Sequence, residues 1–329
     1  GEAAPLPAFD GETQARALAA CEAAAPHLLG RDVRRHRPLA ALVAEHARDR
    51  DGHLVGSAAC ALETAVHDAL CRALGLPLHG FFGGAADAVV TDVTITTGTV
   101  EEARAEAAAF AEFGVLKIKV GGRDDHDVDV DVRRVLAVAE ARPDAALLLD
   151  ANGGLDADDA IHLADELRRR DVRVALFEQP VSARTCGGAR EALEALARVR
   201  RETALPVALD EMVRSPADVR AAYDAGAADA VNVKITKSGI VGVLEIVAAA
   251  RALGLHTMIG GMVETRLAMG TSAAIAAGLG GFVWIDLDTP LFLAEDPFDG
   301  GYAQRGPRLV LATVTHGLAC RPRSPGEGA

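Results

Sequence analysis

The sequence predicts an α/β protein built as a (β/α)7β barrel, a modified TIM barrel, and three observations predict it. Short β-rich runs alternate with amphipathic helical segments rich in Ala, Glu and Arg from residue 88 onward. The centres of successive predicted strands are roughly 25 to 30 residues apart, which suits one β/α unit. The first strand is not followed by a glycine-rich phosphate-binding motif, so an open doubly wound sheet is the weaker alternative.

Residues 1–86 form a mostly helical region that we assign to an N-terminal capping domain. Apolar residues recur at three- and four-residue spacing between residues 13 and 72. The clearest helix, in residues 57–75, stops at Gly75 with Pro77 beyond it. The opening GEAAPLPAFDGET is typical of the exit of a strand into a loop. We therefore expect an α+β cap that is truncated at its start.

The barrel is expected in residues 87–290. Strand patterns occupy residues 89–96, 115–120, 146–150, 174–179, 206–210, 230–235, 256–260 and 283–287. The clearest helical crossovers are residues 100–113, 158–170, 190–201 and 242–254. The eighth strand is not followed by a closing helical pattern, which predicts the (β/α)7β variant. Residues 291–329 are expected to pack back on the cap.

Composition and charge narrow the class of protein. Half of the 329 residues are hydrophobic and a quarter are charged, as in an ordinary globular protein. The net charge of -13, without a long basic run, argues against binding to nucleic acid or to an anionic membrane surface. The apolar runs are too short to span a bilayer. Five scattered cysteines without a CxxC pair favour reduced thiols in a cytoplasmic protein and give no cysteine framework for a metal. The partner we expect is a small-molecule substrate.

Three acidic residues end consecutive predicted strands: Asp150 the third, Glu178 the fourth and Asp210 the fifth. Because the carboxyl ends of barrel strands meet at one face, these carboxylates would converge and repel one another without a cation. Oxygen ligands with no His or Cys nearby select Mg²⁺. One acid alone also fits the cap of the following helix, but three in consecutive strands favour a metal site.

Lysines stand at the ends of the second and sixth predicted strands. Lys117 and Lys119 are two positions apart in an apolar run, so both side chains leave on one face. Lys234 belongs to the strand expected across the barrel from Lys119. Two bases on opposite sides of a substrate carbon can take a proton from one face and return it to the other. Lys117 would then favour the neutral, basic form of Lys119. A single lysine at a strand end is more often a solvated side chain.

These motifs together resemble the enolase superfamily, and specifically its muconate lactonizing subgroup. The matching motifs are Lys117-Ile118-Lys119, Asp150-Ala151-Asn152, Glu178-Gln179-Pro180, Asp210-Glu211 and Lys234-x-x-Lys237-Ser238-Gly239. The resemblance extends from Gly1 to about Leu318, and the ordered set is specific although each motif alone is weak. It implies that the three acids bind Mg²⁺, that Lys119 and Lys234 are the bases, and that the metal holds an enediolate. Asn152 and Glu211 would have supporting roles.

The stretch WIDLDTP at the end of the eighth predicted strand favours a dipeptide substrate within that subgroup. Asp286 and Asp288 would lie on one face about 7 Å apart, a spacing that suits a cation. They resemble the Asp-x-Asp motif by which dipeptide epimerases hold the free α-ammonium group. The alternative is that Asp288 caps a short helix. The run IGGMVETRLAMGTSAA also resembles the epimerase version, with Glu264 near the substrate.

The hypothesis is therefore Mg²⁺-dependent epimerisation of a dipeptide at the α-carbon of its C-terminal residue by 1,1-proton transfer between two lysines. Within the same subgroup, the alternatives are an o-succinylbenzoate synthase, a cycloisomerase and an N-acylamino acid racemase. From other classes, a non-catalytic, truncated binder of metal and carboxylate and a Schiff-base lysine enzyme remain open, although the acid cluster disfavours the Schiff base. The Ala-rich helices are compatible with a homo-oligomer.

Overall fold

The structure is a computed structural model and describes residues 1–122 and 127–323. Its main sheet has eight strands in sequence order, and β2 to β7 pair in parallel. The strands are β2 (Val93–Ile95), β3 (Val115–Lys119), β4 (Ala146–Asp150), β5 (Val174–Glu178), β6 (Val207–Leu209), β7 (Ala230–Val233), β8 (His256–Ile259) and β9 (Trp284–Ile285). The predicted α/β class and its eight strands are confirmed.

The first and the eighth predicted strands differ most from the structure. The run at residues 89–96 is divided, because β1 (Ala88–Val90) pairs with β12 (Arg308–Val310) in another sheet and only β2 joins the main sheet. Burial explains the division, since Val90 is exposed whereas Val93 is buried. The eighth predicted strand is also shorter, because the chain leaves the sheet after Ile285 and enters the 3-10 helix η2 (Thr289–Leu291).

The chain divides into two compact units. The terminal unit consists of Gly1–Val90, Val233–Val247 and Ile259–Ala329, and the central unit of Thr91–Asn232 and Ala248–Met258. The division therefore cuts through β7, through β8 and through the helix between them, α12 (Ile235–Ala252).

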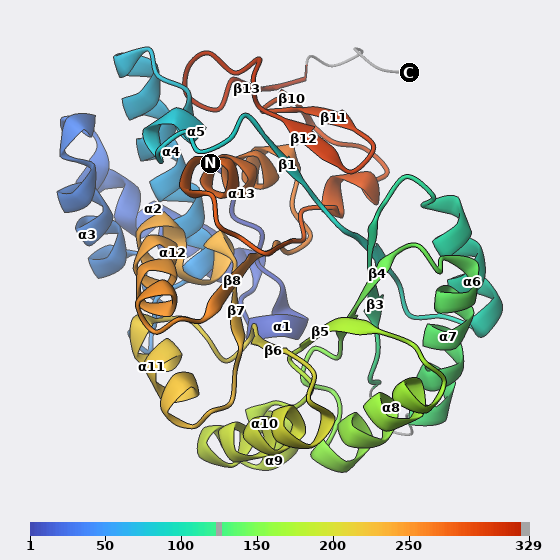
Figure 1. Cartoon of the computed structure of the whole chain (residues 1–329). Helices are drawn as coiled ribbons and strands as arrows, with labels where there is room; N and C mark the ends of the chain where they lie inside the picture. Colours follow the sequence, from blue (N-terminus) through green and yellow to red (C-terminus); the bar gives the residue numbers. More distant parts are fainter. Residues whose placement is uncertain (123–126, 324–329) are drawn as a thin grey trace. The chain divides into compact units, whose positions relative to one another are not determined.

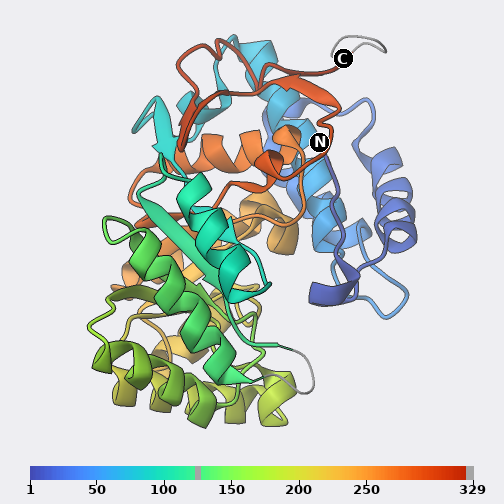
Figure 2. The same cartoon turned by 90° about the vertical axis from the view of Figure 1, so that its right-hand side faces the viewer.

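Helices of the central unit cover the outer face of its strands (Figure 1). They are α6 (Val100–Ala109), α7 (Val128–Ala141), α8 (Ala157–Arg169), α9 (Ala183–Cys186), α10 (Ala189–Thr203) and α11 (Pro216–Asp224). Polar residues begin several of them: Thr99 forms a capping box with Glu102, and Asp156 accepts a hydrogen bond from Asp159 N. The helices α6, α7 and α8 lie in front of the strands in Figure 2. Their buried apolar residues pack against strand residues such as Leu116 and Ile118.

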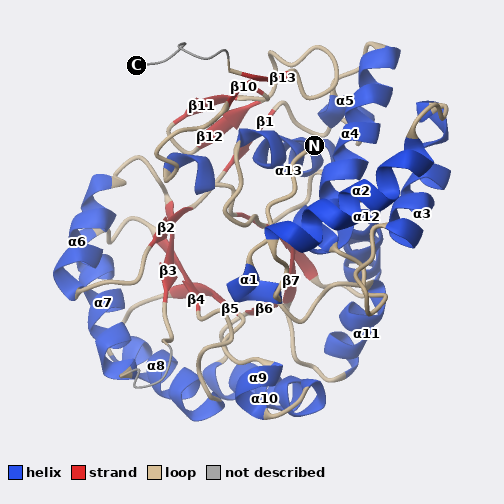
Figure 3. Ribbon diagram, turned by 180° about the vertical axis from the view of Figure 1, so that it is seen from behind, coloured by secondary structure: helices blue, strands red, loops and turns tan. Residues whose placement is uncertain are grey.

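The terminal unit contains the N-terminal helices, α13 and two small sheets (Figure 3). Its remaining elements are α1 (Pro7–Asp10), α2 (Gln14–Leu28), η1 (Val33–Arg35), α3 (His36–His46), α4 (Gly56–Leu74), α5 (Leu78–Phe81), α13 (Arg266–Leu279), β10 (Phe298–Gly300), β11 (Ala303–Arg305) and β13 (Cys320–Pro322). The small sheets have the orders β1-β12-β11 and β10-β13, both antiparallel. The C-terminal segment returns to the N-terminal helices, since Leu318 N donates to Asp68 Oδ1 of α4 over 2.7 Å.

All five cysteines lie within the described residues and are free thiols. Among those same residues, the helices lack the combination of length and apolar character that a bilayer crossing requires.

Candidate active site

Strand register brings a lysine and two acids together at the carboxyl ends of β3, β4 and β5. Lys119 is paired with Asp150 across β3 and β4, and Asp150 is paired with Glu178 across β4 and β5. Because neighbouring strands lie about 4.8 Å apart, these side chains leave the sheet side by side. Lys119 Nζ donates to Asp150 Oδ2 over 2.5 Å. This charge-assisted hydrogen bond fixes the end of the Lys119 side chain in the central unit.

Lys117 and Lys119 share one face of β3, as the sequence analysis expected. Both ammonium groups approach the same acid, since Lys117 Nζ lies 3.5 Å from Asp150 Oδ2. Lys117 Nζ also lies 4.0 Å from Glu178 Oε2. The Lys117 side chain is 4% exposed and that of Lys119 is 27% exposed, so Lys119 is the more accessible of the two. Leu116 and Ile118 alternate with them and are buried against the helices.

Asp210 follows β6 directly and is held by a residue that the sequence analysis did not single out for a role. Gln179 Oε1 accepts a hydrogen bond from Asp210 N over 2.8 Å, and Gln179 Nε2 donates to Val181 O. Gln179 is fully buried and has a positive φ of 35°. Through its hydrogen bond with Asp210 N, Gln179 connects the end of β5 to the end of β6. Its place in the Glu-Gln-Pro motif was the available signal.

Two asparagines form further hydrogen bonds with these charged groups. Asn152 Oδ1 accepts from Lys119 Nζ over 2.8 Å, and its Nδ2 donates to Glu211 Oε1 over 3.1 Å. Asn152 thus links Lys119 at the end of β3 to Glu211, two positions after β6. Asn232 Nδ2, which the sequence analysis did not identify, donates to Glu178 Oε1 over 2.6 Å.

Three buried acids stand at these strand ends, and their chemistry suits a hard divalent cation. Asp150, Glu178 and Asp210 are at most 1% exposed, so their negative charges lie almost completely out of water. Burying several carboxylates without compensating positive charge is costly. All three offer the oxygen atoms that Mg²⁺ prefers, at the strand ends where a barrel places its ligands. The two lysines of β3 already contribute positive charge here, which is the electrostatic environment that these acids require.

The terminal unit holds the third predicted lysine. Lys234 follows β7 and is buried, and its Nζ lies over the ring of Phe9 in α1, 5.1 Å from the ring centroid. The contact is a cation–π interaction that the sequence analysis missed, because an aromatic residue in PAFDG gives no sign of its distant partner. Lys237 lies one helical turn after Lys234, and its N–H donates to Lys234 O.

Glu264 follows β8 in the terminal unit and is almost completely buried. Its Oε2 accepts a hydrogen bond from Met262 N over 3.0 Å. Burial raises the pKa of Glu264 to about 7; the Met262 N–H lowers it, the Glu2 charge raises it and Lys234 lowers it. This carboxyl group is therefore able to hold or release a proton near neutral pH.

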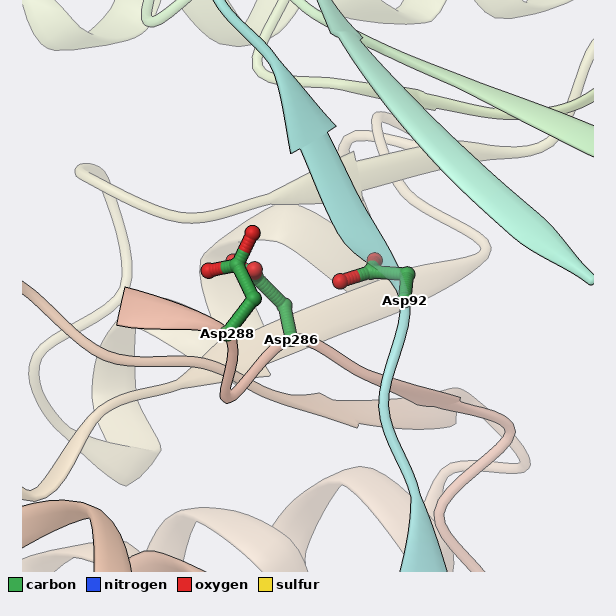
Figure 4. A group of neighbouring side chains, drawn as sticks. All are labelled: Asp92, Asp286 and Asp288. Carbon is green, nitrogen blue, oxygen red and sulfur yellow. The ribbon is translucent and has the colours of Figure 1, made fainter. Parts of the chain in front are cut away.

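Asp286 and Asp288 follow β9 in the terminal unit, and Figure 4 shows their carboxylates beside each other. One oxygen of each lies within 4.8 Å of the other, and both residues are buried. Two close, buried carboxylates favour a cationic ligand. Asp288 stands at the N-cap position of η2, but its side chain forms no cap hydrogen bond there, so its carboxylate does not serve as the cap. Figure 4 also labels Asp92, a buried acid of the central unit that the sequence analysis did not consider.

The predicted site residues are thus divided between the units. The central unit holds Lys117, Lys119, Asp150, Asn152, Glu178 and Asp210, and the terminal unit holds Lys234, Glu264, Asp286 and Asp288.

A comparison with protein families identifies the chain. Residues 98–328, more than half of it, match the family described as Enolase C-terminal domain-like. The chain belongs to this family. Its predicted resemblance to the enolase superfamily is confirmed.

Relatives of this Enolase C-terminal domain-like protein include named epimerases. The aromatic dipeptide epimerase of Herpetosiphon aurantiacus is 44% identical over 321 residues, which cover 97% of this chain and 86% of that protein. The crystal structure of a mandelate racemase/muconate lactonizing enzyme from Roseiflexus sp. has 47% identity and a TM-score of 0.92, and the match covers 99% of this chain and 89% of that one. The dipeptide epimerase of Enterococcus faecalis V583, complexed with Mg and the dipeptide L-Leu-L-Tyr, has 28% identity and a TM-score of 0.87, with 97% and 87% covered.

These relatives confirm the enzyme class that was predicted for this family member, an isomerase of the racemase and epimerase type that acts on amino-acid derivatives.

Proposed function

We propose that this chain epimerises dipeptides at the α-carbon of the C-terminal residue, with Mg²⁺ as cofactor and lysines as the bases. The observation that carries the proposal is the contact of Lys119 Nζ with Asp150, beside two further buried acids, at the carboxyl ends of neighbouring strands. The dipeptide and the metal in the Enterococcus faecalis relative support the choice of substrate and cofactor.

The lysines would carry the proton. Lys119 would exchange a proton with one face of the α-carbon, and Lys234 with the other, so that loss on one side and return on the other inverts the centre. Lys117, buried beside Asp150 and Glu178, would contribute positive charge that favours the neutral form of Lys119. Asn152 would hold Lys119 Nζ in place between proton transfers.

The metal would be held by Asp150, Glu178 and Asp210, with Gln179 and Asn232 fixing two of these ligands. Mg²⁺ bound there would offset the negative charge that builds up on the substrate carboxylate when the α-proton leaves. The chain's own part is to keep the three carboxylates buried, separate and oriented, so that their oxygens need no rearrangement during the reaction.

The acids after β9 would select a substrate with a free amino terminus. Asp286 and Asp288 would accept hydrogen bonds from the α-ammonium group of the first residue, whose charge suits a buried pair of carboxylates. A substrate without an ammonium group would leave that pair uncompensated. This contrast favours a dipeptide over a muconate or a succinylbenzoate.

The experiment that tests the proposal is an exchange screen in D2O. L,L-dipeptide libraries are incubated with the chain and Mg²⁺, returned to H2O to remove labile deuterium, and analysed by mass spectrometry. A gain of one dalton at the α-carbon of the C-terminal residue, for some dipeptides and not for others, is the expected result. Absence of the gain for every dipeptide would exclude the proposed reaction.

A further inference from the structure

The carboxyl end of β3 is held by two charged residues of α7 that have no part in the proposed chemistry. Arg134 Nη1 donates to Lys119 O over 2.7 Å, and Arg134 Nη2 donates to Thr96 O, just after β2, over 2.5 Å. Asp131 Oδ2 accepts from Gly121 N over 2.6 Å. The backbone is therefore held at the carbonyl of Lys119 itself and at the N–H two residues beyond it, and the same guanidinium ties it to the end of β2.

Arg134 and Asp131 form one buried unit. Asp131 Oδ1 accepts a hydrogen bond from Arg134 Nη1 over 2.9 Å, and Asp131 and Arg134 are 1% and 2% exposed. A buried ion pair gains little stability over well-packed apolar residues of similar volume. What it supplies instead is directed hydrogen bonding, because a guanidinium offers several donors in a fixed plane.

We propose that Arg134 and Asp131 are positioning residues for Lys119, which they orient by fixing the backbone at the end of β3. The inference rests on the proposed function, since it assumes that Lys119 is one of the two bases. The Lys119 side chain begins at the same residue whose carbonyl Arg134 holds. Rotation of that carbonyl would swing the side chain away from Asp150 and Asn152, which Nζ now contacts.

The sensitivity of proton transfer to geometry makes this role measurable. A displacement of about 1 Å at a reacting group costs on the order of a hundredfold in rate. Lys234 belongs to the other unit, and its contact with Phe9 does not involve α7. Loosening β3 should therefore slow the proton transfers of Lys119 more than those of Lys234, and the two stereoisomers of the substrate should be affected unequally.

The first variant is Arg134→Lys, which keeps the positive charge beside Asp131 but loses the planar fork that reaches two carbonyls. The chain offers a matched control in Arg142, which also caps buried carbonyls. Arg142 Nη1 donates to Phe110 O and Nη2 to Phe113 O, each over 2.7 Å, and Asp144 is its acidic partner. Arg142 lies after α7, ahead of β4, so Arg142→Lys perturbs the same unit at the opposite end of the strands.

The measurement is the rate of α-proton exchange in D2O for each stereoisomer of the C-terminal residue. Lys119→Ala identifies the stereoisomer whose α-proton Lys119 removes. In Arg134→Lys, exchange of that stereoisomer should fall about tenfold or more relative to the other. In Arg142→Lys the ratio of the two rates should stay within about twofold of wild type.

The outcomes are distinguishable. An equal loss for both stereoisomers in Arg134→Lys, or the same change of ratio in Arg142→Lys, would overturn the positioning role and leave the proposed function intact. Wild-type chain without any exchange would overturn the function and this inference together. If Arg134→Lys does not fold, Asp131→Asn is measured instead, because the amide keeps an oxygen that accepts from Gly121 N but places an NH2 group, which cannot accept, opposite Arg134. An unchanged ratio in Asp131→Asn would equally refute the inference.

Discussion

Replacement of Glu63 should remove a pH dependence from the stability of the fold. Glu63 lies on α4, and its Oε2 accepts a hydrogen bond from Val241 N in α12 over 2.8 Å. Burial raises the pKa of Glu63 from its ordinary value of 4.5 to about 7. The N–H groups of Val241 and Ile240 and the charge of Arg37 lower this pKa, and the charge of Glu245 raises it.

Stability should fall as the pH rises, because the pKa of Glu63 is higher in the folded state than in the unfolded state. Stability from the neutral Glu63 side chain is fully present below about pH 4.5 and is lost as the pH rises through about 7. For one group with these two pKa values, the loss between pH 5 and pH 8 is about 2.5 kcal/mol at 1.36 kcal/mol per pKa unit. Glu264, whose pKa is also raised to about 7, should add a similar loss.

Urea unfolding at pH 5 and at pH 8 measures this effect. Glu63→Gln keeps the shape of the side chain and cannot ionise. Between pH 5 and pH 8, the decrease in its free energy of unfolding should therefore be smaller than the decrease for wild type, and the two should differ by about 2.5 kcal/mol. Glu22→Gln, which changes an exposed glutamate of α2, should keep the wild-type difference. If Glu63→Gln shows the same difference as wild type, the buried carboxyl group is not the source of the pH dependence.

The remaining predictions concern the proposed reaction. Lys119→Ala and Lys234→Ala should each abolish epimerisation in a chiral product assay, while one of them still exchanges the α-proton of one stereoisomer; wild-type rates in both would rule out two-lysine transfer. Asp286→Asn should weaken binding of a dipeptide, measured calorimetrically, by about tenfold or more relative to its N-acetylated analogue, because only the former carries an ammonium group. If Asp286→Asn weakens binding of both ligands equally, Asp286 does not bind the α-ammonium group. Chelation by EDTA should abolish α-proton exchange, and added Mg²⁺ should restore it. An exchange rate that EDTA leaves unchanged would rule out a metal requirement.

Sequence reasoning located the charged residues because each stands at the end of a strand with a clear pattern. The apolar run around Lys117 and Lys119 fixes which side chains share a face, since the period of a strand is two. Parallel strands in sequence order then place their carboxyl ends at one edge. The pairing of Lys119 with Asp150, and of Asp150 with Glu178, is the register that this reasoning requires.

The supporting residues could not be found in the same way. Gln179, Asn232 and Arg134 act through hydrogen bonds to atoms 15 or more positions away in the chain. Such contacts depend on the final packing of helices and strands, and a residue type alone does not reveal its distant partner. The division of residues 89–96 between two sheets was missed for a related reason, because β1 pairs with β12 more than two hundred positions later.

The surroundings of Lys234 follow from two acids that anchor the N-terminal segment, the buried Glu12 and the partly buried Glu2. Glu2 accepts hydrogen bonds from Thr265 N and Ala268 N at the start of α13, and Glu12 accepts from Gly56 N and Ser57 N at the start of α4. Carboxylates are favourable at helix N-termini, where backbone N–H groups lack intrahelical partners. Because α1 lies between these two anchors, its position in the terminal unit is fixed from both sides. The contact of Phe9 with Lys234 therefore depends on hydrogen bonds that neither residue makes itself. Loss of Glu2 or Glu12 should make the position of Lys234 less well fixed, although the substitution is made outside this contact.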